Sequence, residues 1–217
     1  MPANDHSTVA VLLAAGLSRR FGGIKQLANV VSDEGEASLL EQGVKTLLKS
    51  KVDRLVVATG DYHSLLAELD LPNVTLLKCP NSAQGLGHTI ADVASYLRNE
   101  QEYFSHILFF LADQVAVSFE EINRLIETSL ANPERLVSAQ FDLSLSPPVI
   151  FPRAYIGQLT QLEGDKGAKA ILLSHKENLI PVRMNSASVD IDTQLELDSW
   201  NHQIKNKPKI SKQREDA

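Results

Sequence analysis

Short apolar runs alternate with longer segments of helical period along the chain. The apolar runs are rich in Val, Leu and Ile and predict strands over residues 9–13, 55–59, 74–77, 107–112 and 136–139. Between them, apolar residues recur every three or four positions and predict helices over 39–48, 62–69, 89–97 and 119–130. Strands that are apolar throughout and alternate with helices are typical of a parallel sheet covered on both faces. We therefore expect an α/β fold with a three-layer, mostly parallel, doubly wound (Rossmann-like) sheet.

The pattern changes after residue 141. A polar, proline-rich stretch at 144–148 predicts a break, and it is followed by an apolar run at 149–151, a helix over 165–173, a strand near 179–182 and a last helix near 193–200. The acidic stretch 29–38 is expected to be a solvated loop. We interpret the later elements as an elaboration on the same sheet, so that residues 1–204 form one domain. Residues 205–217 are expected to be a disordered tail.

Charge and cysteine content narrow the function classes. The 217 residues carry a net charge of −6, but the basic tail contributes +3, so the body stands at −9. This acidic net charge argues against a broad surface for binding nucleic acid or an anionic membrane. Cys79 is the single cysteine, which excludes an intramolecular disulfide and a zinc site built on cysteines. With no signal pattern and no membrane-length apolar run, we expect a cytoplasmic protein.

The residues just beyond the strands are the first place to look for chemistry, because doubly wound sheets bind ligands at the carboxyl ends of their strands. The stretch after Leu13 reads AAGLSRRFGGIKQ and combines small residues with two arginines and Lys25. Small residues let backbone N–H groups approach a ligand, and the cations suit a polyphosphate. It is neither a P-loop nor a GxGxxG fingerprint. A surface turn with solvated cations is the alternative.

Three aspartates are candidate metal ligands. Asp113 ends the most apolar predicted strand, where a carboxylate is costly unless it faces a cleft or binds a cation. A role as helix cap is less favoured, because Ser118 can cap the following helix itself. Asp190 and Asp192 flank Ile191, so an extended chain would point both to one face, where they could share a metal with Asp113. Asp192 could instead cap the last helix, and which of the two is the second ligand stays open.

Five motifs in order link the chain to a known family. LAAGLSRRFGGIK at 13–25 matches the signature LAAGxSxRxGxxK, and it is followed by NSAQG with TI at 81–90, LADQ at 111–114, GDKGA at 164–168 and DIDT at 190–193. Over about residues 9–198 the chain resembles the molybdenum cofactor nucleotidyltransferases, and LAAG rather than LAGG resembles the cytidylyltransferase branch. The resemblance implies a fold of the nucleotide-diphospho-sugar transferase type.

The resemblance also implies a reaction and a set of residues. CMP would pass from CTP, favoured over GTP, to a phosphorylated acceptor such as molybdopterin, with Mg²⁺ as cofactor and release of pyrophosphate. Such a transfer needs positioning and charge neutralisation rather than a covalent nucleophile. The nucleotide would be bound by Leu13, Ala14, Ala15, Gly16, Arg20, Lys25, Asn81 and Gly85; Arg20 and Lys25 would be catalytic; Asp113, Asp192 and Asp190 would hold the metal.

Two alternative functions remain open at this point. One is transfer to a sugar, polyol or other small phosphate. The other is a nucleotide-binding insertion chaperone, without transfer activity, for a molybdoenzyme partner. Val115 stands where the family usually has Pro, and Ser146-Pro147-Pro148 replaces its G-x-P. Both departures lie toward the acceptor side, so they bear on the identity of the acceptor.

Overall fold

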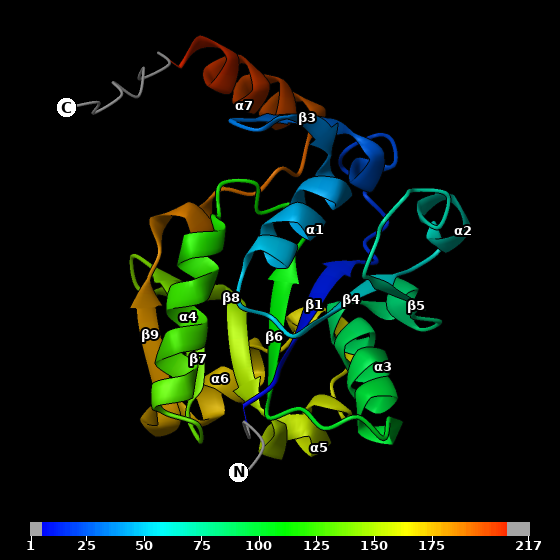
Figure 1. Ribbon diagram of the computed structural model, residues 1–217. Helices are drawn as coiled ribbons and strands as arrows, with labels where there is room; N and C mark the ends of the chain where they lie inside the picture. The colour runs from blue at the N-terminus through cyan, green and yellow to red at the C-terminus, as the bar shows by residue number, and fades with distance from the viewer. Residues whose placement is uncertain (1–5, 208–217) are drawn as a thin grey trace, which may run out of the picture.

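The computed structural model describes residues 6–207, and its centre is a seven-stranded sheet (Figure 1). Across the sheet the strands are β5 (Thr75–Lys78), β4 (Arg54–Thr59), β1 (Thr8–Ala14), β6 (His106–Leu111), β8 (Ser144–Pro152), β7 (Leu136–Phe141) and β9 (Leu179–Arg183). Strand β8 runs antiparallel to its neighbours β6 and β7, and every other pairing in this sheet is parallel. The predicted mostly parallel sheet is confirmed.

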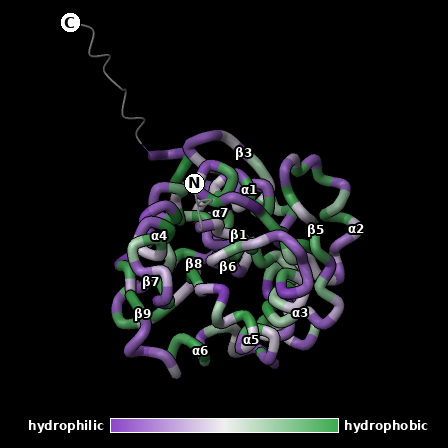
Figure 2. The backbone as a smooth tube through the Cα atoms, turned by 60° about the horizontal axis from the view of Figure 1, so that its bottom comes forward, coloured by the Kyte–Doolittle hydropathy of each residue, from purple (hydrophilic) through white to green (hydrophobic). Residues whose placement is uncertain are grey.

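Helices cover both faces of the sheet. One face is packed by α1 (Leu39–Lys49), α2 (His63–Leu66) and α4 (Phe119–Ala131), and the other by α3 (Leu86–Asn99), α5 (Ile156–Leu159) and α6 (Lys169–Ser174). Successive residues of β1 point to opposite faces, so Val11 and Leu13 join one core and Leu12 joins the other. Hydrophobic and hydrophilic segments alternate along α4, as a helix with one buried face requires (Figure 2). The three layers are confirmed.

Short 3₁₀ turns connect these elements. They are η1 (Lys25–Leu27), η2 (Ser82–Gln84), η3 (Arg153–Tyr155), η4 (Gly164–Lys166), η5 (Lys176–Asn178) and η6 (Asn185–Ser188). The helix predicted over 165–173 is therefore wrong in its first half, because η4 and α6 are separate. Gly167 divides them: it has a φ of +53°, a left-handed conformation that a continuous right-handed helix cannot contain.

The stretch 29–38, predicted as a solvated loop, is a two-stranded hairpin of β2 (Asn29–Ser32) and β3 (Gly35–Ser38). It lies against the last helix, α7 (Gln194–Asn206), away from the main sheet (Figure 1). Val30 is buried between them, and the Trp200 indole N–H donates to the Val31 carbonyl oxygen at 3.0 Å. Trp200 therefore anchors this helix to the hairpin.

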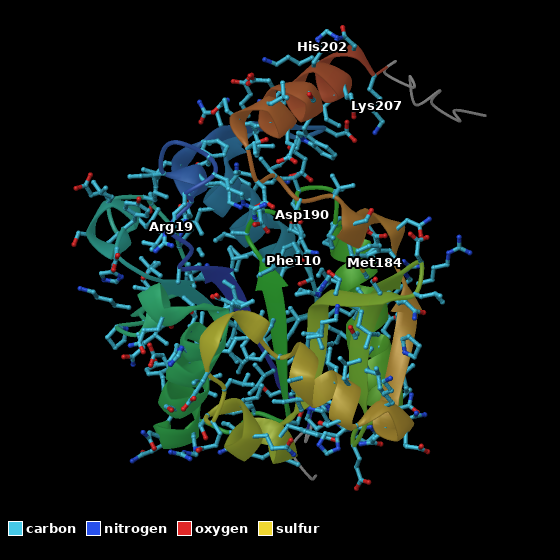
Figure 3. All side chains as sticks on the ribbon, turned by 180° about the vertical axis from the view of Figure 1, so that it is seen from behind. Arg19, Phe110, Met184, Asp190, His202 and Lys207 are labelled. Carbon is cyan, nitrogen blue, oxygen red and sulfur yellow. The ribbon has the colours of Figure 1, made fainter. Side chains whose placement is uncertain are left out.

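The hairpin's acidic side chains are paired rather than only solvated. Glu34 pairs with Lys49 on α1, and Glu36 pairs with Lys205 on α7 at 3.0 Å. Lys205 belongs to the stretch expected to be a disordered tail, but α7 continues through it to Asn206. Figure 3 shows His202 and Lys207 at this outer end of α7. The rest of the expected tail, residues 208–217, lies outside the described residues.

The proline-rich stretch 144–148 is part of a strand, so the predicted break is wrong. Pro147 and Pro148 cannot donate to a ladder, and the pairing of β8 with β7 shifts register at this point, between Ser138 and Ala139. The β6 ladder begins only at Val149, so it is not affected by the prolines. In the part of the chain that the structure describes, no helix is long and apolar enough to cross a membrane.

His106 at the start of β6 gives the fold a testable pH dependence. The side chain is 1% exposed, and its burial lowers the pKa of the imidazole below the ordinary value. As the pH falls below about 6.5, His106 therefore gains a proton in the unfolded chain before it does so in the folded chain. The free energy of unfolding then decreases. We expect the difference in unfolding free energy between wild type and His106→Gln to narrow from about pH 7.5 to about pH 5.5 in urea titrations. A constant difference would contradict this account.

Candidate active site

Loops that follow β1, β5 and β6 meet at the carboxyl edge of the sheet and surround a cleft of about 640 Å³. Its lining comprises residues 13–20, Lys25, Gln26 and Leu39 on one side, 82–86 and Thr89 on another, and Leu111–Asp113, Asp165 and Asp192 on the third. The loop after β4 supports the cleft from behind, since Gly60 packs against the Ala15 carbonyl and Ser82. The ends of β1, β4, β5 and β6 therefore gather at one place.

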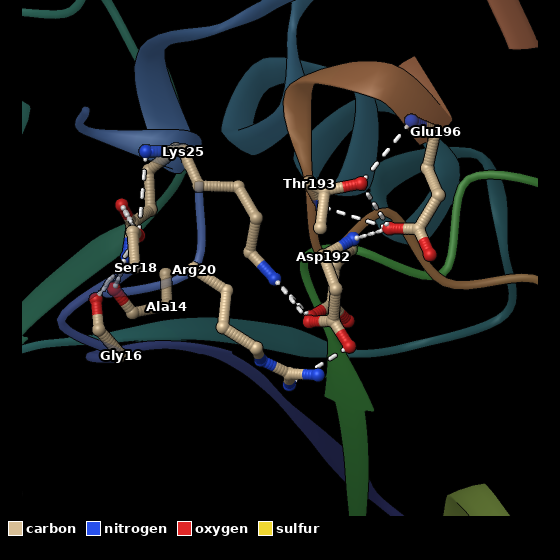
Figure 4. A network of polar contacts seen from close by, with 10 residues as sticks. Ala14, Gly16, Ser18, Arg20, Lys25, Asp192, Thr193 and Glu196 are labelled. Atoms are coloured by element: carbon tan, nitrogen blue, oxygen red, sulfur yellow. Dashed lines mark hydrogen bonds and ion pairs between the residues drawn. The ribbon is translucent and has the colours of Figure 1, made fainter. Parts of the chain in front are cut away.

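A charged cluster crosses the mouth of this cleft. Lys25 Nζ lies 2.6 Å from Asp113 Oδ2 and 3.2 Å from Asp192 Oδ1, and Arg20 Nη2 lies 2.9 Å from Asp192 Oδ2. Figure 4 shows Lys25 and Arg20 reaching toward Asp192 from the opposite side. The Lys25 side chain is 15% exposed and that of Arg20 74%. Because solvent screens exposed charges, the Lys25 contacts are the stronger ones.

The segment Asp190–Asp192 reaches this cluster because Ile191 between them is anchored. Ile191 is 2% exposed, and its N–H donates to the Asp113 carbonyl oxygen at 3.1 Å. Thr193 caps α7 in a reciprocal pair with Glu196, so capping does not occupy the Asp192 carboxylate. The same holds for Asp113, because Ser118 caps α4 as predicted. Both carboxylates are therefore available to the cleft.

Asp190 stands close to the same charges. Burial of its carboxyl raises the pKa of Asp190, and the negative charges of Asp113 and Asp192 raise it further. Figure 3 places Asp190 and Arg19 at the same edge of the sheet, beyond the strand that carries Phe110. The predicted alternation thus brings both aspartates to one region, although Asp192 alone contacts Lys25. The metal role of Asp190 stays a prediction.

The carboxylates at the cleft provide oxygen donors for a divalent metal. Asp113 Oδ1 is buried, and among residues 6–207 it has no hydrogen-bond partner. An orphaned carboxylate oxygen suits Mg²⁺, which prefers oxygen ligands and retains water. Within the described chain no three or more His, Cys, Asp or Glu side chains converge on one point. Asp113 and Asp192 are the pair that fits, with water or a ligand left to complete the coordination.

Residues 13–16 form the floor of the cleft. Leu13, Ala14 and Ala15 are buried by the protein, whereas a Cβ placed on Gly16 would meet no atom within 4 Å. The space over Gly16 is therefore open to a ligand. The Ala112 N–H donates to the Leu13 carbonyl oxygen at 3.3 Å, which ties this floor to the strand end that carries Asp113.

Gln26 holds the loop in place, and the sequence analysis missed it. Its side chain is buried and donates through Nε2 to the carbonyl oxygens of Ala14 and Gly16. The available signal was weak, namely a polar residue directly after the motif lysine Lys25.

The loop after β5 presents Gly85 to the cleft but not Asn81. The Asn81 amide donates to Asp92 Oδ1 at 2.8 Å, and the residue does not line the cleft. Asn81 thereby holds the loop to α3, and its contact with the nucleotide stays a prediction. Gly85 is required by a close approach, because an added Cβ would lie 2.6 Å from the Gly164 carbonyl. His88 contacts the same turn, since its Nδ1 accepts from the Gly164 N–H at 3.1 Å.

Residues 10–179 match the family model described as the MobA-like NTP transferase domain. The match spans most of the chain, and the protein belongs to this nucleotidyltransferase family. A curated relative, purine catabolism protein PucB from Bacillus subtilis, is 28% identical over 201 residues, which cover 88% of this chain and 94% of PucB.

Solved structures agree on the fold. Rv0371c from Mycobacterium tuberculosis H37Rv superposes with a TM-score of 0.74 at 22% identity, covering 93% of this chain and 100% of that one. CMP:2-keto-3-deoxy-manno-octonic acid synthetase in complex with CTP superposes with a TM-score of 0.68 at 13% identity, covering 92% and 98%. The expected fold of the nucleotide-diphospho-sugar transferase type is confirmed.

Gly60 allows a test of how closely the loops pack behind the cleft. A Cβ at this position would lie 2.6 Å from the Ala15 carbonyl oxygen, which is backbone and cannot move away cheaply. We expect Gly60→Ala to destabilise the protein by about 1–3 kcal/mol, measured by urea denaturation. Gly157→Ala is the matched control, because a Cβ on Gly157 meets nothing within 4 Å. Equal stability of the two variants would contradict the packing described.

Proposed function

We propose that this nucleotidyltransferase moves CMP from CTP to a phosphorylated acceptor, with molybdopterin as the acceptor, and releases pyrophosphate. The observation that carries the proposal is the cluster in which Lys25 and Arg20 face Asp113 and Asp192 across one cleft. Two cations suit the phosphates of a nucleotide, and two carboxylates suit a divalent metal. The motif resemblance of residues 13–25 supports cytidine and molybdopterin.

The reaction joins an acceptor phosphate oxygen to the α-phosphorus of CTP and breaks the bond from that phosphorus to the β-phosphate bridge oxygen. Pyrophosphate leaves with the bonding electron pair. Lys25 and Arg20 would neutralise the charge that develops on the phosphoryl oxygens, and backbone N–H groups beside Gly16 would orient the nucleotide. Asp113 and Asp192, with Asp190 near them, would hold Mg²⁺, which supplies further positive charge to the phosphates when it is bound.

Lys25 has to exchange partners in this scheme. Without nucleotide its ammonium is held by Asp113 and Asp192, and a bound triphosphate offers it new oxygens in the same cleft. The carboxylates of Asp113 and Asp192 would then be free to hold a divalent metal. Before nucleotide binds, the two carboxylates therefore keep the Lys25 ammonium in the cleft and paired, so that no partly buried charge is left without a partner.

A nucleotide-by-acceptor panel tests the proposal. The protein is given each of the four NTPs, labelled at the α-phosphate, with molybdopterin, a sugar phosphate or a polyol phosphate in the presence of Mg²⁺. We expect label transfer and pyrophosphate release to be greatest with CTP and molybdopterin. Label on a sugar or polyol phosphate instead would overturn the acceptor, greater use of GTP would overturn the cytidine preference, and binding without transfer would overturn the enzymatic role.

Substitutions at the cluster should abolish transfer while the fold survives. We expect Lys25→Ala and Asp113→Asn each to lower kcat by about 10²–10³-fold, the range for loss of one preorganised electrostatic contact. The matched controls are Lys45→Ala on α1 and Asp70→Asn, since both residues are exposed and lie outside the cleft. Urea denaturation would establish that all four variants fold. Full activity of the Lys25 and Asp113 variants would show that the site lies elsewhere.

Metal binding provides a readout without catalysis. The Lys25 ammonium competes for the carboxylates of Asp113 and Asp192, so Lys25→Met should bind Mn²⁺ more tightly than wild type when no nucleotide is present. Calorimetry or Mn²⁺ electron spin resonance measures this affinity. Arg20→Met should tighten Mn²⁺ binding less, because Arg20 is exposed and, among residues 6–207, forms an ion pair with Asp192 alone. Unchanged or weaker Mn²⁺ binding by Lys25→Met would argue against this pair as the metal site.

A further inference from the structure

Gln26 is a buried polar residue in the wall of the cleft. It lies on η1 directly after Lys25 and is 4% exposed. Its Nε2 donates to the Ala14 carbonyl oxygen at 2.9 Å and to the Gly16 carbonyl oxygen at 2.8 Å. The side chain therefore connects the turn that presents Lys25 to the floor of the cleft.

The orientation of this amide follows from its surroundings. Two carbonyl oxygens can be approached only by the NH₂ group, because the amide oxygen would be repelled by both. Gln26 Oε1 then accepts from the Ser18 hydroxyl at 3.2 Å. The Lys25 N–H in turn donates to Ser18 Oγ at 3.3 Å. Figure 4 shows Ala14, Gly16 and Ser18 grouped beside the backbone of Lys25.

These bonds determine which backbone groups the loop offers to a ligand. In a trans peptide the C=O and the following N–H point in opposite directions. With the carbonyls of Ala14 and Gly16 turned toward Gln26, the N–H groups of Ala15 and Leu17 point away from it. Neither N–H has an acceptor among the described residues, and both residues line the cleft. Gln26 thus turns the hydrogen-bond donors of Ala15 and Leu17 toward the cleft.

We propose that Gln26 is a positioning residue for an anionic nucleotide. It keeps two carbonyl oxygens turned away from the ligand, so that the donors of Ala15 and Leu17 face it, and it fixes η1 so that Lys25 addresses the same ligand. The inference rests on the proposed nucleotidyl transfer and deepens it by assigning the loop geometry to one side chain. Gln26 itself takes no part in bond making or breaking.

The test compares two buried glutamines that make the same kind of contact. Gln26→Met keeps the length of the side chain and removes its bonds to two carbonyls. Gln114→Met does the same elsewhere: Gln114 is 3% exposed and donates to the carbonyls of Pro147 and Ala187 at 2.8 and 3.0 Å. We expect similar losses of stability from the two changes. CTP affinity, measured by calorimetry in EDTA, should fall about tenfold for Gln26→Met only, the effect of about 1.4 kcal/mol.

A spectroscopic signature separates positioning from a merely structural role. In the wild type, adding CTP should shift the amide resonances of Ala15 and Leu17 as their N–H groups gain an acceptor, and the shifts should shrink in Gln26→Met. Equal CTP affinity of the two methionine variants, or undiminished amide shifts in folded Gln26→Met, would overturn the proposal.

Two further results keep the proposals distinguishable. If Gln26→Met does not fold, Ser18→Ala removes the partner of Oε1, and it should weaken CTP binding in the same direction; unchanged affinity would overturn the role of Gln26. If wild type binds none of the four nucleoside triphosphates, the proposed function itself fails. This failure is seen in the wild type alone and so differs from a failed comparison between variants. Without a bound nucleotide, the proposed role of Gln26 would fail as well.

Discussion

The contact of Lys25 with Asp113 and Asp192 is the constraint on which the rest of the site depends. It joins three segments that lie far apart in the chain, and different local contacts hold each segment at the cleft. A buried central strand, β6, ends at Asp113. The cap at Thr193 and the buried Ile191 hold Asp192 in place. The turn η1, anchored by Gln26, presents Lys25. Loss of any of these supports would leave a partly buried charge without its partner.

The same contact explains how an acidic protein could handle phosphates. The body before residue 205 carries −9, but net charge describes the whole surface and not one cleft. Around the mouth of the cleft, Lys25 and Arg20 pair with Asp113 and Asp192, and burial together with these two negative charges raises the pKa of the nearby Asp190. A metal added to the carboxylates would make the cleft positive. The acidic cluster thus supports phosphate binding through the cations it can hold.

Local sequence was enough to predict the sheet and the strand ends that border the cleft. Strand runs such as 107–112 are apolar on both faces, and the positions of Asp113 and Gly16 follow from where those runs end. The hairpin at 29–38 was missed because its burial depends on α7, some 160 residues later in the chain. The strand through Pro147 and Pro148 was missed because prolines usually interrupt a strand. Here the pairing of β8 with β7 shifts register beside them, and the strand continues. Gln26 was missed for the same reason, since its partners, the carbonyls of Ala14 and Gly16, are set by tertiary contacts.

The most direct measurement is the position of a metal and a nucleotide in crystals of the protein soaked with Mn²⁺ and an α,β-non-hydrolysable CTP. The account predicts an anomalous Mn²⁺ peak between Asp113 and Asp192, phosphates over Gly16, and Lys25 Nζ moved from the carboxylates onto a phosphate oxygen. Mn²⁺ bound away from both aspartates, with Lys25 still paired to Asp113 while nucleotide occupies the cleft, would contradict it.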